Sequence, residues 1–171
     1  DPTHIINVLR ELAYNMHFGK KTSVSSEEIS QIAEVYKKEY RQIVNIKSFL
    51  DAVLSAKILI DNNNEYRFRD HTIIAYFVAQ ALNQKYYQDE DIKDNLDELL
   101  RNLCFSINSD IVLFLALITN NPKFVNIIIE GAQKHFESQE ELSFDRKNVE
   151  YILNTKLPIK DSLPDKEERK Q

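Results

Sequence analysis

Hydrophobic residues recur with the spacing of an α-helix along most of this chain. Over residues 3–18, five apolar positions fall on one helical face: Ile5, Leu9, Leu12, Ala13 and Met16. The same spacing predicts further helices after Ser25, at 46–56, at 71–87, at 91–103, at 109–119, from Pro122 onward and at 146–155. The predicted fold class is therefore all-α, in the sense of an α-rich chain.

Capping residues mark where several of these helices begin or end. Gly19 follows the first helix as a stop signal. Ser25 and Glu28 have the spacing of a capping box, in which each side chain accepts a hydrogen bond from the other residue's backbone. Asn121 is expected to cap the helix that starts at Pro122, because proline is favoured at the first helical position. These signals divide the periodic segments into separate helices.

One segment departs from helical spacing. In KILIDNNNEYRFR, residues 57–69, two runs of β-favouring residues flank four polar residues, 61–64, that tolerate turn geometry. This pattern predicts a β-hairpin. Three helices followed by a hairpin is the order of a winged-helix unit. We therefore expect a winged-helix-like unit at 1–70, a helical domain at 71–157 and a polar tail or linker at 158–171.

The segment 109–119 is apolar nearly all round, which predicts a central, enclosed helix. The preceding residues SINSD, 106–110, offer several candidate caps for it. An interruption between two helices is expected at 88–91, within a stretch of acidic residues.

Composition narrows the class of protein. Only two glycines and four prolines occur in 171 residues, which disfavours an all-β fold with its many tight turns. The single cysteine excludes an internal disulfide framework and fits a reducing compartment, and Cys104 is expected to be buried and inert. No signal-peptide pattern is present, and the longest apolar run, 111–118, is far short of the roughly 20 residues that span a bilayer. We therefore expect a cytoplasmic location without a membrane partner, and the start at Asp1 rather than Met points to a segment of a longer protein.

Patterns typical of catalysis are missing from the sequence. The two glycines, Gly19 and Gly131, are isolated, so no glycine-rich loop for phosphate exists. The four histidines are scattered, and no serine lies in a nucleophile-elbow context. The acidic residues of 89–98 are interpreted as a solvated helix start rather than as paired carboxylates for acid–base work. We expect no catalytic, cofactor-binding or metal-binding residues, and no enzyme activity in this chain alone.

A nucleic-acid partner is not favoured by the charges. The net charge is −5, which disfavours nonspecific binding to a phosphate backbone. In the helix that precedes the hairpin, Asp51 offsets the charge of Lys47. Arg67 and Arg69 have acidic residues around them and are expected on the exposed face of a strand whose other face, Tyr66 and Phe68, packs inward. The absence of a basic stripe therefore disfavours nucleic acid as a partner of this chain.

Residues 66–82, YRFRDHTIIAYFVAQAL, combine the end of the hairpin with the start of a helix, for which Asp70 or Thr72 is the expected cap. This stretch resembles the motif that closes the winged-helix region of bacterial STAND-type NTPases of the NACHT class. The matching residues are Tyr66, Phe68, Tyr76, Phe77 and Ala79. The segments 50–59 and 101–136 are also similar to that family, so the resemblance covers most of 25–137.

The resemblance implies a noncatalytic regulatory and interaction module, C-terminal to an NTPase core, that couples this core to downstream domains in antiviral defence or signalling. ATP and Mg²⁺ would belong to the parent protein, with no cofactor in this segment. Its partners would be other domains of the parent chain, with a protein trigger or self-association as further partners. The five matching residues would form a structural joint that holds the hairpin on the following helix, at an interface with two packed arrangements. The alternative is a winged-helix nucleic-acid-binding domain, and a third possibility is a free-standing helical adaptor.

Overall fold

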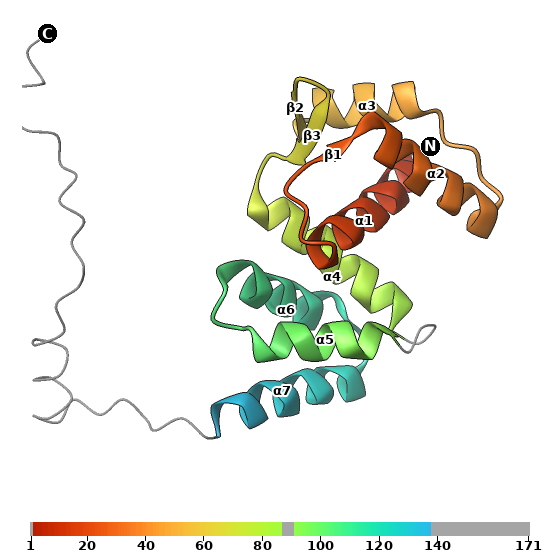
Figure 1. Cartoon of the computed structure of the whole chain (residues 1–171). Helices are drawn as coiled ribbons and strands as arrows, with labels where there is room; N and C mark the ends of the chain where they lie inside the picture. Colours follow the sequence, from red (N-terminus) through yellow and green to blue (C-terminus); the bar gives the residue numbers. More distant parts are fainter. Residues whose placement is uncertain (1, 87–90, 138–171) are drawn as a thin grey trace, which may run out of the picture. The chain divides into compact units, whose positions relative to one another are not determined.

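The computed structural model describes residues 2–86 and 91–137 of the 171-residue chain (Figure 1). Its elements lie in one compact unit, Asp1–Phe136, whereas the second unit, Glu137–Gln171, lies outside the described residues apart from Glu137. The predicted helix at 146–155, the tail at 158–171 and most of the expected break at 88–91 also fall outside them. In chain order the elements are α1 (Pro2–Phe18), β1 (Val24–Ser25), α2 (Ser26–Tyr40), α3 (Ile46–Ser55), β2 (Leu59–Asn62), β3 (Glu65–Phe68), α4 (His71–Lys85), α5 (Asp91–Arg101), α6 (Ser106–Ile118) and α7 (Pro122–Phe136).

The prediction of an α-rich fold with a small hairpin is confirmed. The hairpin closes through Asn63 and Asn64, whose φ angles of 57° and 66° are those of a two-residue type I′ turn. The Asp61 carboxylate accepts a hydrogen bond from the Asn64 backbone N–H at 2.8 Å and stabilises this turn.

A third strand, β1, was not predicted. It pairs antiparallel with β3, so the sheet order is β1-β3-β2, and Val24 lies opposite Tyr66. Two residues are too few for a detectable alternation of apolar and polar positions, and only the tertiary pairing defines them as a strand.

The predicted caps at the starts of α2, α4 and α7 are confirmed. At α2, the Ser25 Oγ accepts a hydrogen bond from the Glu28 N–H at 3.2 Å, and Glu28 in turn accepts one from the Ser25 N–H at 2.8 Å. Asp70 caps α4 by accepting a hydrogen bond from the Thr72 N–H at 2.7 Å. Asn121 accepts one from the backbone of the residue after Pro122 at 2.9 Å. Each cap satisfies a backbone donor that the first turn of a helix leaves unpaired.

Gly19 follows the last residue of α1, as expected, but it is Lys20 that adopts the left-handed conformation, with φ of 54°. A Cβ on Gly19 would lie 2.5 Å from the Asn15 carbonyl oxygen, so the glycine provides space rather than a positive φ.

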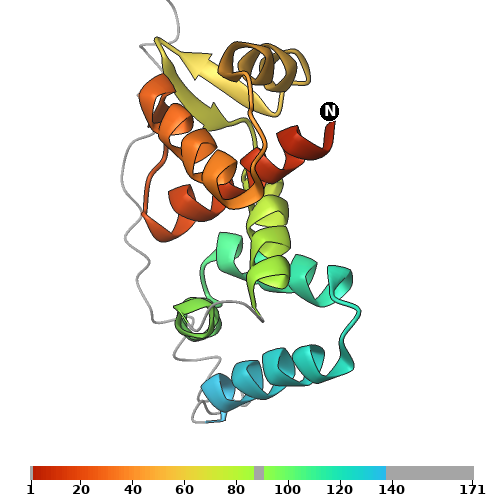
Figure 2. The same cartoon turned by 90° about the vertical axis from the view of Figure 1, so that its right-hand side faces the viewer.

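Helix α4 lies at the centre of the unit. It packs against α1 on one side and against α6 on the other (Figures 1 and 2). One continuous hydrophobic core includes side chains from all seven helices and the three strands. Its most deeply buried members include Val8, Leu12, Ile29, Phe49, Leu59, Val78, Leu82, Ile92, Ile111, Leu115 and Phe124. The predicted domain boundary at residue 70 stays a prediction, but the core itself runs across it.

The expectation that 109–119 is an enclosed helix is wrong. Helix α6 buries only Asn108, Ile111 and Leu115, whereas Leu113 and Leu117 are 58% and 71% exposed. The reason is positional, since α4, α5 and α7 pack against α6 and no described element covers its outer face.

The predicted caps of this helix are also wrong. It starts three residues earlier than expected, after Phe105, which makes no side-chain capping hydrogen bond. Asn108 is instead buried, and its side-chain amide donates a hydrogen bond to the Asn102 carbonyl oxygen at 3.0 Å. It therefore satisfies a backbone acceptor in the turn after α5. Cys104 lies in this turn and is exposed, which corrects its expected burial, because the short connection keeps it outside the core.

Candidate functional site

The five residues of the predicted joint, Tyr66, Phe68, Tyr76, Phe77 and Ala79, come from β3 and α4 and are here called the aromatic joint. All except Tyr76 are buried, and Tyr76 is 38% exposed. Alternation along β3 turns Tyr66 and Phe68 inward and leaves the residues between and before them exposed, as the sequence pattern predicted. On α4, adjacent positions separate by about a quarter turn, so Phe77 faces the core whereas Tyr76 lies at its edge.

Rings of the aromatic joint form a chain from the hairpin to α6. Phe68 and Phe77 have ring centroids 6.2 Å apart, and Phe77 and Tyr76 have centroids 5.5 Å apart. Tyr76 then meets Phe114 of α6 edge to face at 5.7 Å. These separations lie in the range of favourable aromatic pairs. The sequence reasoning missed Phe114, because it lies in an apolar run where no single position distinguishes a joint contact from core packing.

Two buried members of the aromatic joint, Tyr66 and Ala79, are not part of this described chain of ring contacts. Among the described aromatic contacts, Tyr66 has no ring partner on α4, and it is held instead in the sheet between Val24 and Asp61. Ala79 is fully buried on α4, where its small side chain leaves room for the neighbouring helices. Phe68 and Phe77, rather than Tyr66, therefore connect the hairpin with α4.

A polar contact lies next to the aromatic joint at the start of α4. His71 lies between two carboxylates: its Nδ1 is 3.8 Å from Asp70 Oδ1, and its Nε2 is 3.6 Å from Oδ2 of Asp110 in α6. The hydrogen bonds from Thr72 hold the pKa of the Asp70 carboxyl below its ordinary value. Because His71 and Asp70 are largely exposed, these pairs add little stability, although they join the same elements as the rings.

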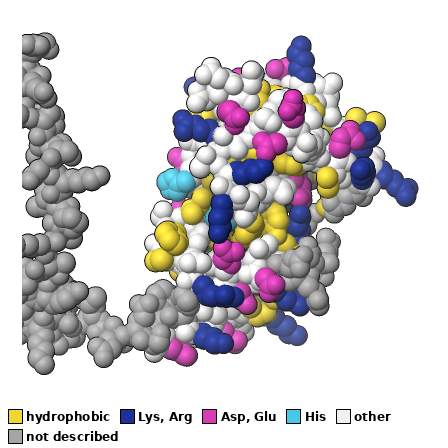
Figure 3. All heavy atoms as spheres, viewed as in Figure 1, with side chains coloured by type: hydrophobic (Ala, Val, Ile, Leu, Met, Phe, Trp, Pro, Cys, Tyr) yellow, Lys and Arg dark blue, Asp and Glu magenta, His cyan; other side chains and the backbone are white. Residues whose placement is uncertain are grey.

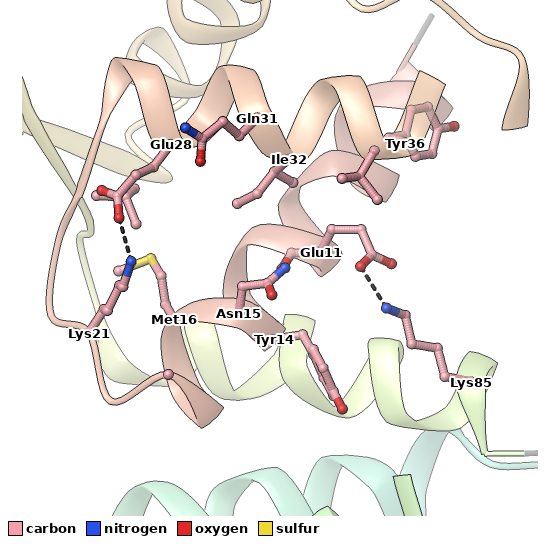
Figure 4. Close-up of a pocket in the computed structure, with 13 residues that line it drawn as sticks. Glu11, Tyr14, Asn15, Met16, Lys21, Glu28, Gln31, Ile32, Tyr36 and Lys85 are labelled. Carbon is pink, nitrogen blue, oxygen red and sulfur yellow. Dashed lines mark hydrogen bonds and ion pairs between the residues drawn. The ribbon is translucent and has the colours of Figure 1, made fainter. Parts of the chain in front are cut away.

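A groove with a volume of about 550 Å³ lies between α1 and α2 (Figure 4). Met16, Ile32 and Val35 supply apolar surface, and ion pairs lie at its two ends. At one end Lys85 of α4 pairs with Glu11 at 2.6 Å, and at the other Lys21 pairs with Glu28.

This groove is not apparent from the sequence. Its α2 wall consists of Glu28, Gln31, Ile32, Val35 and Tyr36, whose spacing along the sequence indicates only an amphipathic helix. The wall becomes a groove only because α1 and the end of α4 pack beside it.

A smaller hollow of about 240 Å³ lies between the end of α1 and α5 and α6. His17 lines it, and burial lowers the pKa of His17 below its ordinary value, although Glu98 opposes this shift. The Lys20 Nζ, which also lines this hollow, lies 3.8 Å from Glu98 Oε1. The hollow is therefore a candidate for pH-dependent stability rather than for catalysis.

The described residues offer no further chemical centre. Within 2–86 and 91–137, no three or more His, Cys, Asp or Glu side chains gather so that they could hold a metal ion. None of the described helices is long and apolar enough to cross a bilayer. Basic and acidic side chains are interspersed over the face seen in Figure 3, without a large area of one sign. Such a surface is not typical of a nucleic-acid interface.

Residues 22–78 match the family model described as Novel STAND NTPase 4. The matched segment runs from β1 through the hairpin into α4 and contains all of the aromatic joint except Ala79. No curated protein and no solved structure matches the chain. The family match supports the relationship with STAND NTPases that the joint residues predicted, whereas the NACHT class and a position C-terminal to the NTPase core stay predictions.

Proposed function

We propose that this chain is a noncatalytic regulatory and interaction module of a bacterial STAND NTPase of the NACHT class. In this proposal, residues 1–70 are a winged-helix unit C-terminal to the NTPase core, and they couple this core to downstream domains. The observation that carries the proposal is the position of the family match. It ends at residue 78, within α4, and the rings of this helix continue the contact to Phe114 in α6, outside the match.

The physical basis of the coupling is shared packing on α4. A displacement of the hairpin acts on Phe77 through Phe68, and a displacement of α4 acts on α6 through Tyr76 and Phe114. Contiguous packed side chains of this kind transmit a change between two arrangements of an interface. The joint would thereby restrain the NTPase core until a protein trigger or self-association changes the packing. A role in antiviral defence or signalling in the cytoplasm is part of this proposal.

Nucleotide chemistry is assigned to the parent protein rather than to this chain. ATP and Mg²⁺ need a loop whose backbone N–H groups approach the phosphates, and the two glycines here are isolated on or next to helices. Gly131 lies where α7 approaches α5, since a Cβ there would meet Leu100 at 2.5 Å. These residues do not fit a nucleotide site, so this chain alone is expected not to hydrolyse ATP or GTP.

The test uses the longer protein that contains this chain. A glycine-rich phosphate-binding loop in the preceding coding sequence is the first requirement. Phe114→Leu then removes the ring contact with Tyr76 while it keeps most of the apolar volume, and we expect a higher basal rate of ATP hydrolysis. Leu113→Ala, at an exposed position on the same helix, serves as the matched control and should leave the rate unchanged. An absent phosphate-binding loop, or equal rates for Phe114→Leu and the parent, contradicts the proposal.

The order of the elements keeps one alternative open. The chain runs through a helix, a short strand, two helices and a hairpin, and its sheet order is β1-β3-β2. A winged-helix nucleic-acid-binding domain has the same order of elements. A titration of labelled duplex DNA at rising salt separates the two functions. Measurable binding that weakens steeply with salt would favour the alternative, because it reports the release of counterions from phosphates.

A further inference from the structure

We infer that the groove between α1 and α2 docks an amphipathic helix from a partner segment, and that this helix presents an uncharged, apolar face. The inference rests on the proposed function as an interaction module and names the surface and the chemistry of its partner. It concerns a different part of the molecule from the aromatic joint, so the two are tested by separate variants.

The shape of the groove favours a helix. Its walls are two helices, with Asn15 and Tyr14 on α1 and with Ile32 and Val35 on α2 (Figure 4). Val35 is an apolar side chain that is 61% exposed at this wall. A third helix that lays an apolar stripe between two others is a common mode of recognition.

The charges of the groove select the kind of face that fits. Glu11 and Lys85 neutralise each other at one end, and both side chains are mostly buried, with exposed fractions of 16% and 22%. Lys85 also lies over the Tyr14 ring, with its Nζ 4.8 Å from the ring centroid. At the other end, Lys21 is occupied by Glu28. A phosphate or other strongly charged ligand would have to break one of these pairs, whereas an uncharged apolar face leaves both intact.

The length of the α2 wall sets the length of the partner. This wall extends from Glu28 to Tyr36, which corresponds to about 12 Å along a helix axis at 1.5 Å per residue. Two turns of a partner helix therefore fill the groove, with anchors spaced three and four residues apart. Gln31, exposed on the same wall, is placed to hydrogen-bond the polar edge of that helix.

The probe is a hydrocarbon-stapled, fluorescein-labelled peptide with leucines at helical spacing on one face and with glutamine and alanine elsewhere. Its binding to the whole 171-residue chain is measured by fluorescence anisotropy. Val35→Glu places a carboxylate in the apolar wall and should weaken binding by at least about tenfold, a change of about 1.4 kcal/mol. Leu117→Glu is the matched control, because it makes the same change at a similarly exposed apolar position on α6, and it should change the Kd less than about twofold.

Circular dichroism of both variants establishes that they are folded, which is expected because both positions are exposed. A peptide that does not bind the parent chain, or that binds the Val35→Glu variant as well as the parent, overturns the inference. Loss of binding with Leu117→Glu instead would assign docking to the outer face of α6. If the peptide fails but Phe114→Leu still raises ATP hydrolysis in the longer protein, only the groove inference is wrong. The reverse pattern would refute the joint and leave the groove as an interaction surface.

Discussion

Replacement of Phe77 by alanine tests whether the aromatic joint is a structural element or an exposed recognition surface. Phe77 is 8% exposed, so nearly the whole ring is removed from water. It also lies in two aromatic pairs, with Phe68 at 6.2 Å and with Tyr76 at 5.5 Å. The substitution therefore removes buried apolar surface and both pairs, and it leaves a cavity between the hairpin and α4.

The expected loss follows from these contacts. Truncation of an enclosed phenylalanine to alanine costs about 3–5 kcal/mol, and we expect the lower part of this range because Tyr76, beside the ring, is partly exposed. For a urea dependence of about 2 kcal/mol per molar, the midpoint of unfolding falls by roughly 1.5–2 M. This loss is a large part of the roughly 5–15 kcal/mol that stabilises a typical domain.

Urea unfolding followed by circular dichroism provides the measurement. Leu113→Ala is the matched control, since Leu113 is 58% exposed on α6 and its truncation should change the free energy of unfolding by no more than about 0.5 kcal/mol. Equal midpoints for Phe77→Ala and Leu113→Ala would refute the reasoning. Loss of partner binding at an unchanged midpoint would instead identify Phe77 as a recognition residue.

Three further predictions concern a cap, a partly buried histidine and the cysteine. Ser25→Ala removes the acceptor that caps α2 and should lower the free energy of unfolding by about 0.5–2 kcal/mol, measured by thermal unfolding, and Ser25→Asn should restore it. Burial lowers the pKa of His17 below its ordinary 6.5, so the unfolded chain binds the proton more readily, and this contribution to stability is complete above pH 6.5 and is lost as the pH falls below it. His17→Gln should therefore flatten the change in urea midpoint between about pH 7.5 and 5.5, and an unchanged slope would contradict the role of His17. Cys104 is exposed and should react with Ellman's reagent in the folded protein without denaturant, whereas protection until unfolding would contradict its position.

The sequence by itself determined the features that depend on neighbouring residues. The capping box of Ser25 and Glu28, the Asp70 cap and the start of α7 at Pro122 all involve groups within three residues of one another, so their pattern is readable along the chain. The hairpin is also local, because its turn geometry is that of two adjacent asparagines. The alternation in β3 correctly placed Phe68 inward, since successive side chains of a strand point to opposite faces.

Features that depend on distant residues were decided only by the tertiary structure. Strand β1 exists because it pairs with β3, about forty residues away, and no local pattern of two residues specifies this pairing. The exposure of Leu113 and Leu117 could not be predicted. The sequence of an apolar helix shows how much apolar surface it has, but it does not show whether other elements cover every side of the helix. The groove likewise requires α1, α2 and Lys85 of α4 to meet, and the ring contact of Tyr76 requires Phe114 from another helix. Periodicity identifies the face of each helix that packs, whereas the partner of that face is set by the three-dimensional packing of the whole core.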